Sequence, residues 1–149
     1  MLSILLALAL VGGPPAANGL ATVPGATNPN LTQAQLCSPS FHTGTIRPPS
    51  NVTNKLKFTL MDEAGIPRSQ SSAYELDHLI SLEIGGAPAD PNNLWLQPYT
   101  GTLNAHVKDR LENQLHKLVC SGKITLHDAQ HDISTDWVGA YKRFVGPLP

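Results

Sequence analysis

The chain has 149 residues, of which 41% are hydrophobic and 14% are charged. This length fits one domain with a modest core, and the composition is neither that of a chain disordered throughout nor that of a membrane protein. The formal net charge of −1 argues against a tight, charge-driven binder of a polyanion. A divalent metal ion would supply positive charge locally, so metal-assisted chemistry on a polyanion is compatible with this composition.

The first residues predict an export signal. Residues 2–11 form an almost unbroken apolar run, and glycines, prolines and alanines follow it. The run is too short to span a bilayer but suits the apolar segment of a signal peptide. We assign residues 1–21 to a signal peptide, with cleavage after Ala17, Gly19 or Ala21, and expect a secreted or periplasmic protein without a membrane span in its mature form. No lysine or arginine precedes the run, so an apolar N-terminal strand or a wrongly assigned start codon is the alternative.

Cys37 and Cys120 are the only two cysteines. In an exported protein, two cysteines predict one disulfide. It would tie the N-terminal segment to the end of a C-terminal helix and contribute on the order of 4 kcal/mol. The alternative, for a chain that is not exported, is a pair of unbonded buried thiols. Two cysteines alone do not make a structural zinc site.

Residues 22–50 are rich in Pro, Gly, Thr, Asn and Ser, which predicts an irregular or extended arm. The rest of the chain, residues 51–149, is expected to form one domain. Its first predicted element is a short helix over residues 53–64, because the apolar residues there share one face and a glycine follows. A polar loop is expected over residues 68–72.

Two short strands are predicted next. Residues 74–84 alternate partly between apolar and polar side chains, and residues 94–96 form a second apolar run that ends before Pro98. Glycines, prolines and aspartate make the connection between them rich in turn residues. The two strands are therefore expected to pair as a hairpin with a long loop.

Two helices complete the predicted domain. Residues 102–121 carry apolar side chains at helical spacing and are followed by Gly122, a natural stop. A second helix is expected to begin at Thr125, a good N-cap, with Asp128 three positions on. The order strand, strand, helix, helix predicts an α+β fold. The apolar face expected on the last helix consists of Leu126, Ala129, Ile133, Trp137, Ala140, Tyr141 and Phe144.

An ordered set of polar residues accompanies these elements. Asp77-His78 lies in the first predicted strand, Asn93-Leu94 follows a Gly-Gly turn region, and a polar helix start covers residues 104–108. The pattern Asp-His-Leu-Ile-x-Leu-x-x-Gly-Gly, then Asn-Leu-Trp, then Ala-x-x-Lys-Asp-x-x-Glu resembles the HNH-like group of ββα-metal (His-Me finger) nucleases. The resemblance covers residues 45–141 and is strongest over residues 74–112.

The resemblance implies both a fold and an activity. The hairpin and the following helix would form a ββα-metal core, with an additional C-terminal helix and the irregular N-terminal arm. The implied activity is that of a metal-dependent endonuclease that hydrolyses phosphodiester bonds in nucleic acid, with DNA favoured over RNA. The implied cofactor is a divalent metal, Mg²⁺ first and Mn²⁺ second.

His78 and Asp77 are the central candidates. A neutral imidazole near neutral pH suits His78 to act as the general base that activates water, whereas its alternative role is a buried histidine satisfied by hydrogen bonds. Asp77 offers a hard oxygen ligand for Mg²⁺ or Mn²⁺, or else is a charge at the solvent-facing edge of the strand. Adjacent residues on a regular strand point to opposite faces, so a bulge or a strand end must re-aim one of them.

Asn93 matches the middle asparagine of the motif. The resemblance implies that its side chain braces the loop and helps to orient the catalytic histidine. The alternative is an ordinary turn residue, since Pro91-Asn92-Asn93 is common turn chemistry.

The last metal ligand has two candidates, Asn104 and His106. Helix phase favours Asn104, because it projects toward the apolar stripe of the helix while His106 falls nearly opposite. Lys108 is a candidate for contacting a substrate phosphate, with a helix-surface charge as its alternative. Asp109 and Glu112 match the Lys-Asp-x-x-Glu pattern and are candidates for supporting roles or for solvated salt bridges.

The remaining histidines show no ligand spacing tied to this site; they are His42, His116, His127 and His131. No Cys-x-x-Cys pair flanks the helix predicted over residues 102–121, so a structural zinc site beside it is not expected. The alternative functions are a non-catalytic secreted binding module on a nuclease-like scaffold and a hydrolase of another phosphate ester.

Overall fold

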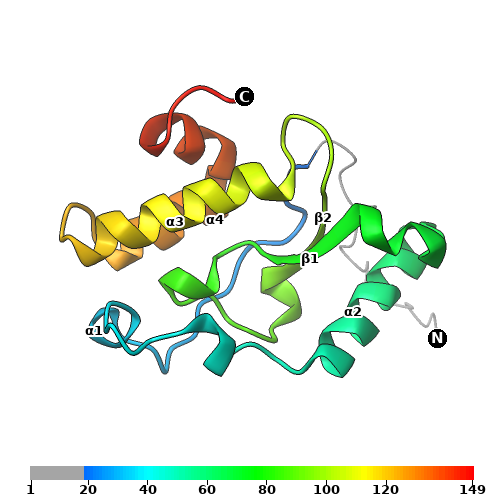
Figure 1. Ribbon diagram of the computed structural model, residues 1–149, viewed down its shortest axis with the longest axis horizontal. Helices are drawn as coiled ribbons and strands as arrows, with labels where there is room; N and C mark the ends of the chain where they lie inside the picture. The colour runs from blue at the N-terminus through cyan, green and yellow to red at the C-terminus, as the bar shows by residue number, and fades with distance from the viewer. Residues whose placement is uncertain (1–18) are drawn as a thin grey trace, which may run out of the picture.

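The computed structural model describes residues 19–149, so the predicted signal peptide lies almost wholly outside the described residues. The described chain mixes helix with a two-stranded antiparallel sheet, which is compatible with the predicted α+β class (Figure 1). Within it, no helix combines the length and the apolarity needed to cross a bilayer. Its helices and strands are α1 (Gln33–Leu36), α2 (Ser50–Glu63), β1 (Tyr74–His78), β2 (Leu94–Pro98), α3 (Ala105–Cys120) and α4 (Leu126–Phe144).

The predicted hairpin forms, but its first strand is shorter than expected. β1 pairs with β2 so that Asp77 lies opposite Trp95 and His78 opposite Leu94. The strand ends at His78, where the sequence predicted continuation to residue 84, because the next backbone groups bind Asn93 instead of a neighbouring strand. Leu79 N donates to Asn93 O at 2.9 Å, and Ile80 N donates to the side-chain Oδ1 of Asn93 at 2.9 Å.

The segment that joins the strands is a compact loop that contains two short 3-10 turns, Leu82–Ile84 and Pro91–Asn93. Gly86 is needed there, because a Cβ at this position would lie 1.7 Å from the carbonyl oxygen of Ile80. The predicted polar loop at residues 68–72 is likewise a 3-10 helix, Arg68–Ala73.

The N-terminal arm is mostly irregular and runs along this loop. Gly25 N donates to Asn92 O, Asn28 N donates to Gly85 O, and an isolated antiparallel bridge joins Thr27 to Gly86. The arm contains one short helix, α1, which begins with a capping box between Thr32 and Gln35. These backbone bonds make the arm part of the domain instead of a separate tail.

The core lies between α3, α4 and the loop that follows β1. Leu111, Leu115 and Ile133 are fully buried at this interface, which confirms the apolar faces predicted for both helices. Thr125 caps α4 as expected, since its side chain accepts a hydrogen bond from Asp128 N. The α4 face that is buried consists of Ala129, Ile133, Trp137, Ala140 and Tyr141, while Leu126 and Phe144 pack against the core from its edge.

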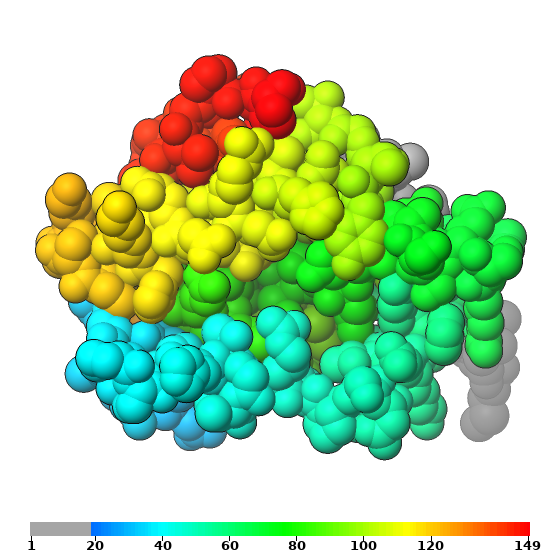
Figure 2. Space-filling view, in the orientation of Figure 1, coloured from blue at the N-terminus to red at the C-terminus, as the bar shows by residue number. Residues whose placement is uncertain are grey.

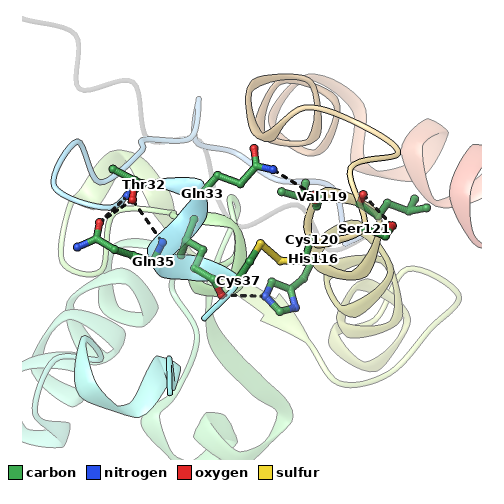
Figure 3. The surroundings of a disulfide bond; sticks show 10 residues. Thr32, Gln33, Gln35, Cys37, His116, Val119, Cys120 and Ser121 are labelled. Carbon is green, nitrogen blue, oxygen red and sulfur yellow. Dashed lines mark hydrogen bonds between the residues drawn. A yellow bond between two sulfur atoms is a disulfide. The ribbon is translucent and has the colours of Figure 1, made fainter. Parts of the chain in front are cut away.

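The predicted disulfide is confirmed. Cys37, just after α1, bonds to Cys120, the last residue of α3, across a sequence separation of 83 residues (Figure 3). Gln33 Nε2 donates to Val119 O at 3.2 Å beside it, and His116 Nε2 lies 3.2 Å from Leu36 O. The disulfide and these two bonds fix the arm against the C-terminal half of α3.

Candidate active site

A hollow of about 80 Å³ opens at the end of β1, between the arm and α3. Figure 2 shows the recess between the cyan arm and the yellow helix, with the green hairpin segment at its floor. The hollow is acidic, because five of its lining residues carry carboxylates: Glu75, Asp77, Glu83, Asp109 and Glu112. Arg47 is the one lysine or arginine among its lining residues.

Asp77 and His78 both line this hollow, although they are neighbours on one strand. The strand end accounts for this arrangement, since His78 is the last residue of β1 and the backbone turns into the loop directly after it. Both residues are more than nine-tenths buried, with exposed fractions of 7% for Asp77 and 6% for His78.

The loop determines the tautomer of His78. Its Nε2 lies 3.0 Å from the carbonyl oxygen of Pro88. A carbonyl oxygen only accepts hydrogen bonds, so Nε2 carries the proton and Nδ1 is the unprotonated nitrogen of the neutral ring. No hydrogen bond among residues 19–149 engages Nδ1. The ring therefore retains a free acceptor in a residue that lines the hollow.

The surroundings of His78 also keep the ring neutral. Burial lowers the pKa of His78 below its ordinary value, although the hydrogen bond to Pro88 and the charge of Asp77 act in the opposite direction. A lowered pKa means that the imidazole stays unprotonated into mildly acidic solution. A neutral imidazole with a free Nδ1 is the state that a general base requires.

Asn93 has the contacts that a bracing residue needs. It is fully buried, and its Oδ1 accepts from Ile80 N and from Ala26 N at 3.3 Å. Its Nδ2 donates to Ile80 O and to Ala87 O, each at 3.0 Å. The side chain thus joins both ends of the loop to the arm, and the loop in turn holds the Pro88 carbonyl that contacts His78.

Lys108 differs most from its prediction. Both a phosphate contact and a helix-surface charge require an exposed ammonium group, but the side chain is fully buried. Its Nζ donates to His78 O at 2.7 Å, pairs with Asp77 Oδ2 at 2.8 Å and bonds Glu112 Oε1 at 2.5 Å. Two N–H groups of Lys108 donate hydrogen bonds and Asp77 adds an ion pair, so Lys108 works as a buried cation beneath the hollow.

Two carboxylates share this one ammonium. Burial alone would lower the pKa of Lys108, but the charges of Asp77 and Glu112 hold that pKa above its ordinary value. Burial raises the pKa of Glu112 to about 7, and Lys108 only partly opposes the shift. Lys108 is therefore permanently charged, whereas Glu112 changes its charge near neutral pH.

Asp109 lies in the hollow together with a residue that the motif does not contain, Glu75. Burial raises the pKa of Glu75 and of Asp109, and the charge of Asp77 adds to both shifts. Burial also raises the pKa of Glu83. The carboxyl groups that line the hollow also outnumber the two cations near them, Lys108 and Arg47.

Asn104 and His106 are not brought into the hollow. Asn104 is the N-cap of α3, with Oδ1 accepting from Val107 N at 3.1 Å and Nδ2 donating to Gly101 O at 2.7 Å. Its backbone is extended, so the helical phase used in its prediction does not apply. The His106 side chain is 72% exposed, stacks on Tyr99, and lies 3.7 Å from Asp109.

Of the three predicted metal ligands, only Asp77 lines the hollow, so a divalent ion bound there would need a further ligand. Within residues 19–149, one group of three Cys, His, Asp or Glu residues has its ligand atoms within 4.8 Å of one another: Cys37, His116 and Cys120. The two sulfur atoms are bonded to each other, and a disulfide sulfur is not the thiolate that binds metals. The oxygens of the acidic hollow suit Mg²⁺ better, because this ion commonly uses one or two carboxylates and retains several waters. Asp77 and Asp109 fit that mode.

Sequence reasoning missed Arg47, Glu75 and Glu83. Glu75 had a usable signal, because it lies two positions before Asp77 and a strand repeats its facing every two residues. Glu83 was assigned to a strand that ends earlier, and Arg47 enters from the arm without any local pattern.

No protein-family model, curated protein or solved structure matches the chain.

Proposed function

We propose that this domain is a metal-dependent endonuclease that hydrolyses phosphodiester bonds in nucleic acid, with His78 as the general base. The observation that carries the proposal is the hydrogen bond between His78 Nε2 and Pro88 O, which leaves Nδ1 free in a residue lining the acidic hollow. The order of hairpin and helix, with Asn93 bracing the loop between the strands, agrees with a ββα-metal core.

The chain's own residues have separable tasks in this reaction. His78 Nδ1 accepts the proton of a water molecule as that water attacks phosphorus. Pro88 O accepts a hydrogen bond from Nε2–H of His78, and this bond stabilises the imidazolium that results. Arg47 lines the hollow and forms no ion pair with any of residues 19–149, so its guanidinium can orient a phosphate. Lys108 holds Asp77 in place from below.

Asp77 and Asp109 are the residues that would hold the divalent ion. When bound, Mg²⁺ or Mn²⁺ supplies the positive charge that stabilises the pentacovalent phosphorus and the leaving oxygen. The acidity of the hollow supports this part of the proposal, because a phosphodiester and several ionised carboxylates would otherwise repel one another.

A plasmid-nicking assay with Mg²⁺ or Mn²⁺, with and without EDTA, tests the proposal. We expect metal-dependent nicking by the wild type and its loss in His78→Ala. The matched control is His127→Ala, because the His127 side chain is 87% exposed on α4 and this variant should nick like the wild type. Nicking by a folded His78→Ala protein at the wild-type rate would refute the role of His78. Parallel assays on single-stranded RNA and DNA establish the preferred nucleic acid.

A non-catalytic binding module is the second candidate, and the position of Lys108 favours it. The ammonium already pairs with Asp77 and Glu112, so part of the carboxylate charge near His78 is neutralised without a metal. A binding module would retain single-stranded or duplex nucleic acid in a gel-shift assay but nick neither with any metal. Cleavage of small phosphodiesters but not of nucleic acid would instead indicate a different phosphate ester as substrate.

A further inference from the structure

A second and larger hollow adjoins the acidic one. It measures about 290 Å³, which is near the lower limit of roughly 300–1,000 Å³ for small-molecule sites and therefore suits a small ligand. Thr43 and Glu83 line both hollows, so the two lie side by side in the recess between the arm and α3, which we call the groove (Figure 2). The side chains lining the second hollow are Phe41, His42, Thr43, Glu83, Asn113 and His116.

The polar atoms of this second hollow are mainly acceptors. Glu83 Oε2 is buried without a hydrogen-bond partner in the described chain. Asn113 Nδ2 donates to Asp109 O at 2.8 Å, which leaves its Oδ1 as an acceptor. His116 Nε2 lies 3.2 Å from the Leu36 carbonyl and must donate there, so Nδ1 of the neutral ring is also an acceptor.

These acceptors determine the kind of ligand that fits. No lysine or arginine lines the second hollow, which argues against a phosphate ligand there. A buried carboxylate oxygen without a partner is costly, and a ligand that donates N–H groups removes that cost. The ligand must therefore be rich in donors and carry no negative charge on the part that enters.

The remaining walls are rings. Phe41, His42 and His116 are ring-bearing residues in the lining of a hollow of the size of a small planar molecule. Nucleobases are commonly recognised by stacking on such side chains while polar groups bond the edge of the base. The rings and the acceptors together describe a base-binding subsite.

We propose that the second hollow binds an unpaired guanine base, with N1–H and the N2 amino group donating to the Glu83 carboxylate. Guanine carries two adjacent donors on its pairing edge, which match the two oxygens of a carboxylate. Adenine and cytosine place an acceptor beside their amino group, and uracil and thymine have a single N–H between two acceptors, so each of these bases would bring an acceptor against Glu83. Base pairing occupies the same guanine edge, so the site selects single-stranded nucleic acid.

The subsite is held in shape by covalent structure. Cys37–Cys120 joins the arm to α3 beside His116, and the Leu36 carbonyl fixes the orientation of that imidazole (Figure 3). A rigid wall reduces the ordering cost of binding a small ligand. The consequence for substrate choice, cleavage beside guanine, rests on the proposed function, whereas the binding of guanine does not.

Nucleoside binding to the full chain in EDTA tests the inference without any catalysis. We expect guanosine to bind roughly tenfold more tightly than inosine, which lacks only the N2 amino group, and more tightly than adenosine, as measured by calorimetry or NMR titration. Glu83→Gln should abolish the difference between guanosine and inosine. Glu63→Gln, a change at an exposed residue of α2, should preserve it.

Equal binding of guanosine and inosine, or no binding of either, would overturn the guanine site, and this comparison needs no variant. A folded Glu83→Gln protein that keeps the guanosine preference would overturn the role of Glu83. Guanosine binding by a protein that fails to nick any nucleic acid would refute the proposed nuclease and leave the guanine site standing. Cutting of single-stranded oligonucleotides beside guanine, lost when inosine replaces it, would join the two proposals.

Discussion

Replacing Lys108 by methionine tests whether this residue is the internal cation of the site. Methionine keeps much of the length of the side chain and removes its charge. The change strands two carboxylates, since Asp77 and Glu112 both form ion pairs with the ammonium and have side-chain exposures of only 10% and 15%. It also removes the donor to His78 O.

The expected cost follows from the burial of this cluster. Removing one partner from a buried ion pair costs about 3–5 kcal/mol, because the remaining charge is desolvated without compensation. Glu112 can reduce part of that cost by taking up a proton, so we expect a loss of about 3 kcal/mol in the free energy of unfolding. Urea denaturation followed by tryptophan fluorescence measures it, and Lys117→Met, an exposed site on the same helix, should change stability by less than about 0.5 kcal/mol.

A double-mutant cycle separates the charge effect from a simple packing defect. Neutralising Glu112 in the Lys108→Met background relieves one of the two stranded carboxylates, so the double variant Lys108→Met with Glu112→Gln should lose less stability than the sum of the single changes. A Lys108→Met protein that unfolds at the wild-type urea concentration, or strict additivity in the cycle, would refute the internal-cation reasoning.

Three further changes test the supports of the site. Burial raises the pKa of Glu112 to about 7 from an unfolded value near 4.5, so the stability that its protonated form contributes is present below 4.5 and lost as the pH rises through 7. Thermal unfolding should therefore show the wild type losing on the order of 3 kcal/mol relative to Glu112→Gln between about pH 5 and about pH 8. Parallel stability curves for the two proteins would contradict this. Asn93→Ala leaves the Ile80 backbone N–H and C=O without their side-chain partner and should cost about 3 kcal/mol in urea unfolding, whereas a change below about 0.5 kcal/mol would show that the loop does not depend on it. Replacing both Cys37 and Cys120 by serine opens a loop closed over 83 residues and should lower the free energy of unfolding by about 4 kcal/mol. The wild type in a thiol reductant should fall to the melting temperature of this variant. An effect of the reductant on the serine variant itself would point to another cause.

Periodicity and capping chemistry predicted the elements that surround the site. The stripe through Leu111 and Leu115 identified α3, and Thr125 marked the start of α4. The first strand was predicted too long because Ile80 and Leu82 continue its apolar alternation, although their burial comes from the loop and from α3. Apolar alternation reports burial, and a compact loop produces the same pattern as a strand.

The contacts of the site were predicted less well than its residues. Asp77, His78 and Asp109 do meet in one hollow, whereas Asn104 is consumed by capping, a role its residue type also favours. Lys108 lies in helical phase with Leu111 and Leu115, so its burial had a periodic signal that its charge concealed. The contribution of the arm had no local signal, since Arg47 comes from a segment that is attached to the domain by the disulfide and by backbone bonds of residues 25–28 to residues 85–92.

The balance of charge in the groove links its two hollows. Lys108 is committed to Asp77 and Glu112 beneath the surface, so Arg47 alone faces the remaining carboxylates from the protein side. A phosphodiester that enters the first hollow therefore requires an added cation to offset repulsion, whereas the uncharged edge of a base that enters the second hollow is attracted by the same carboxylates. Under the two proposals, a single-stranded nucleotide would supply both groups at adjacent positions, the base in the hollow lined by Glu83 and the phosphate in the hollow lined by His78. If both proposals hold, single-stranded nucleic acid is expected to fit the two hollows better than a free phosphate ester or a duplex.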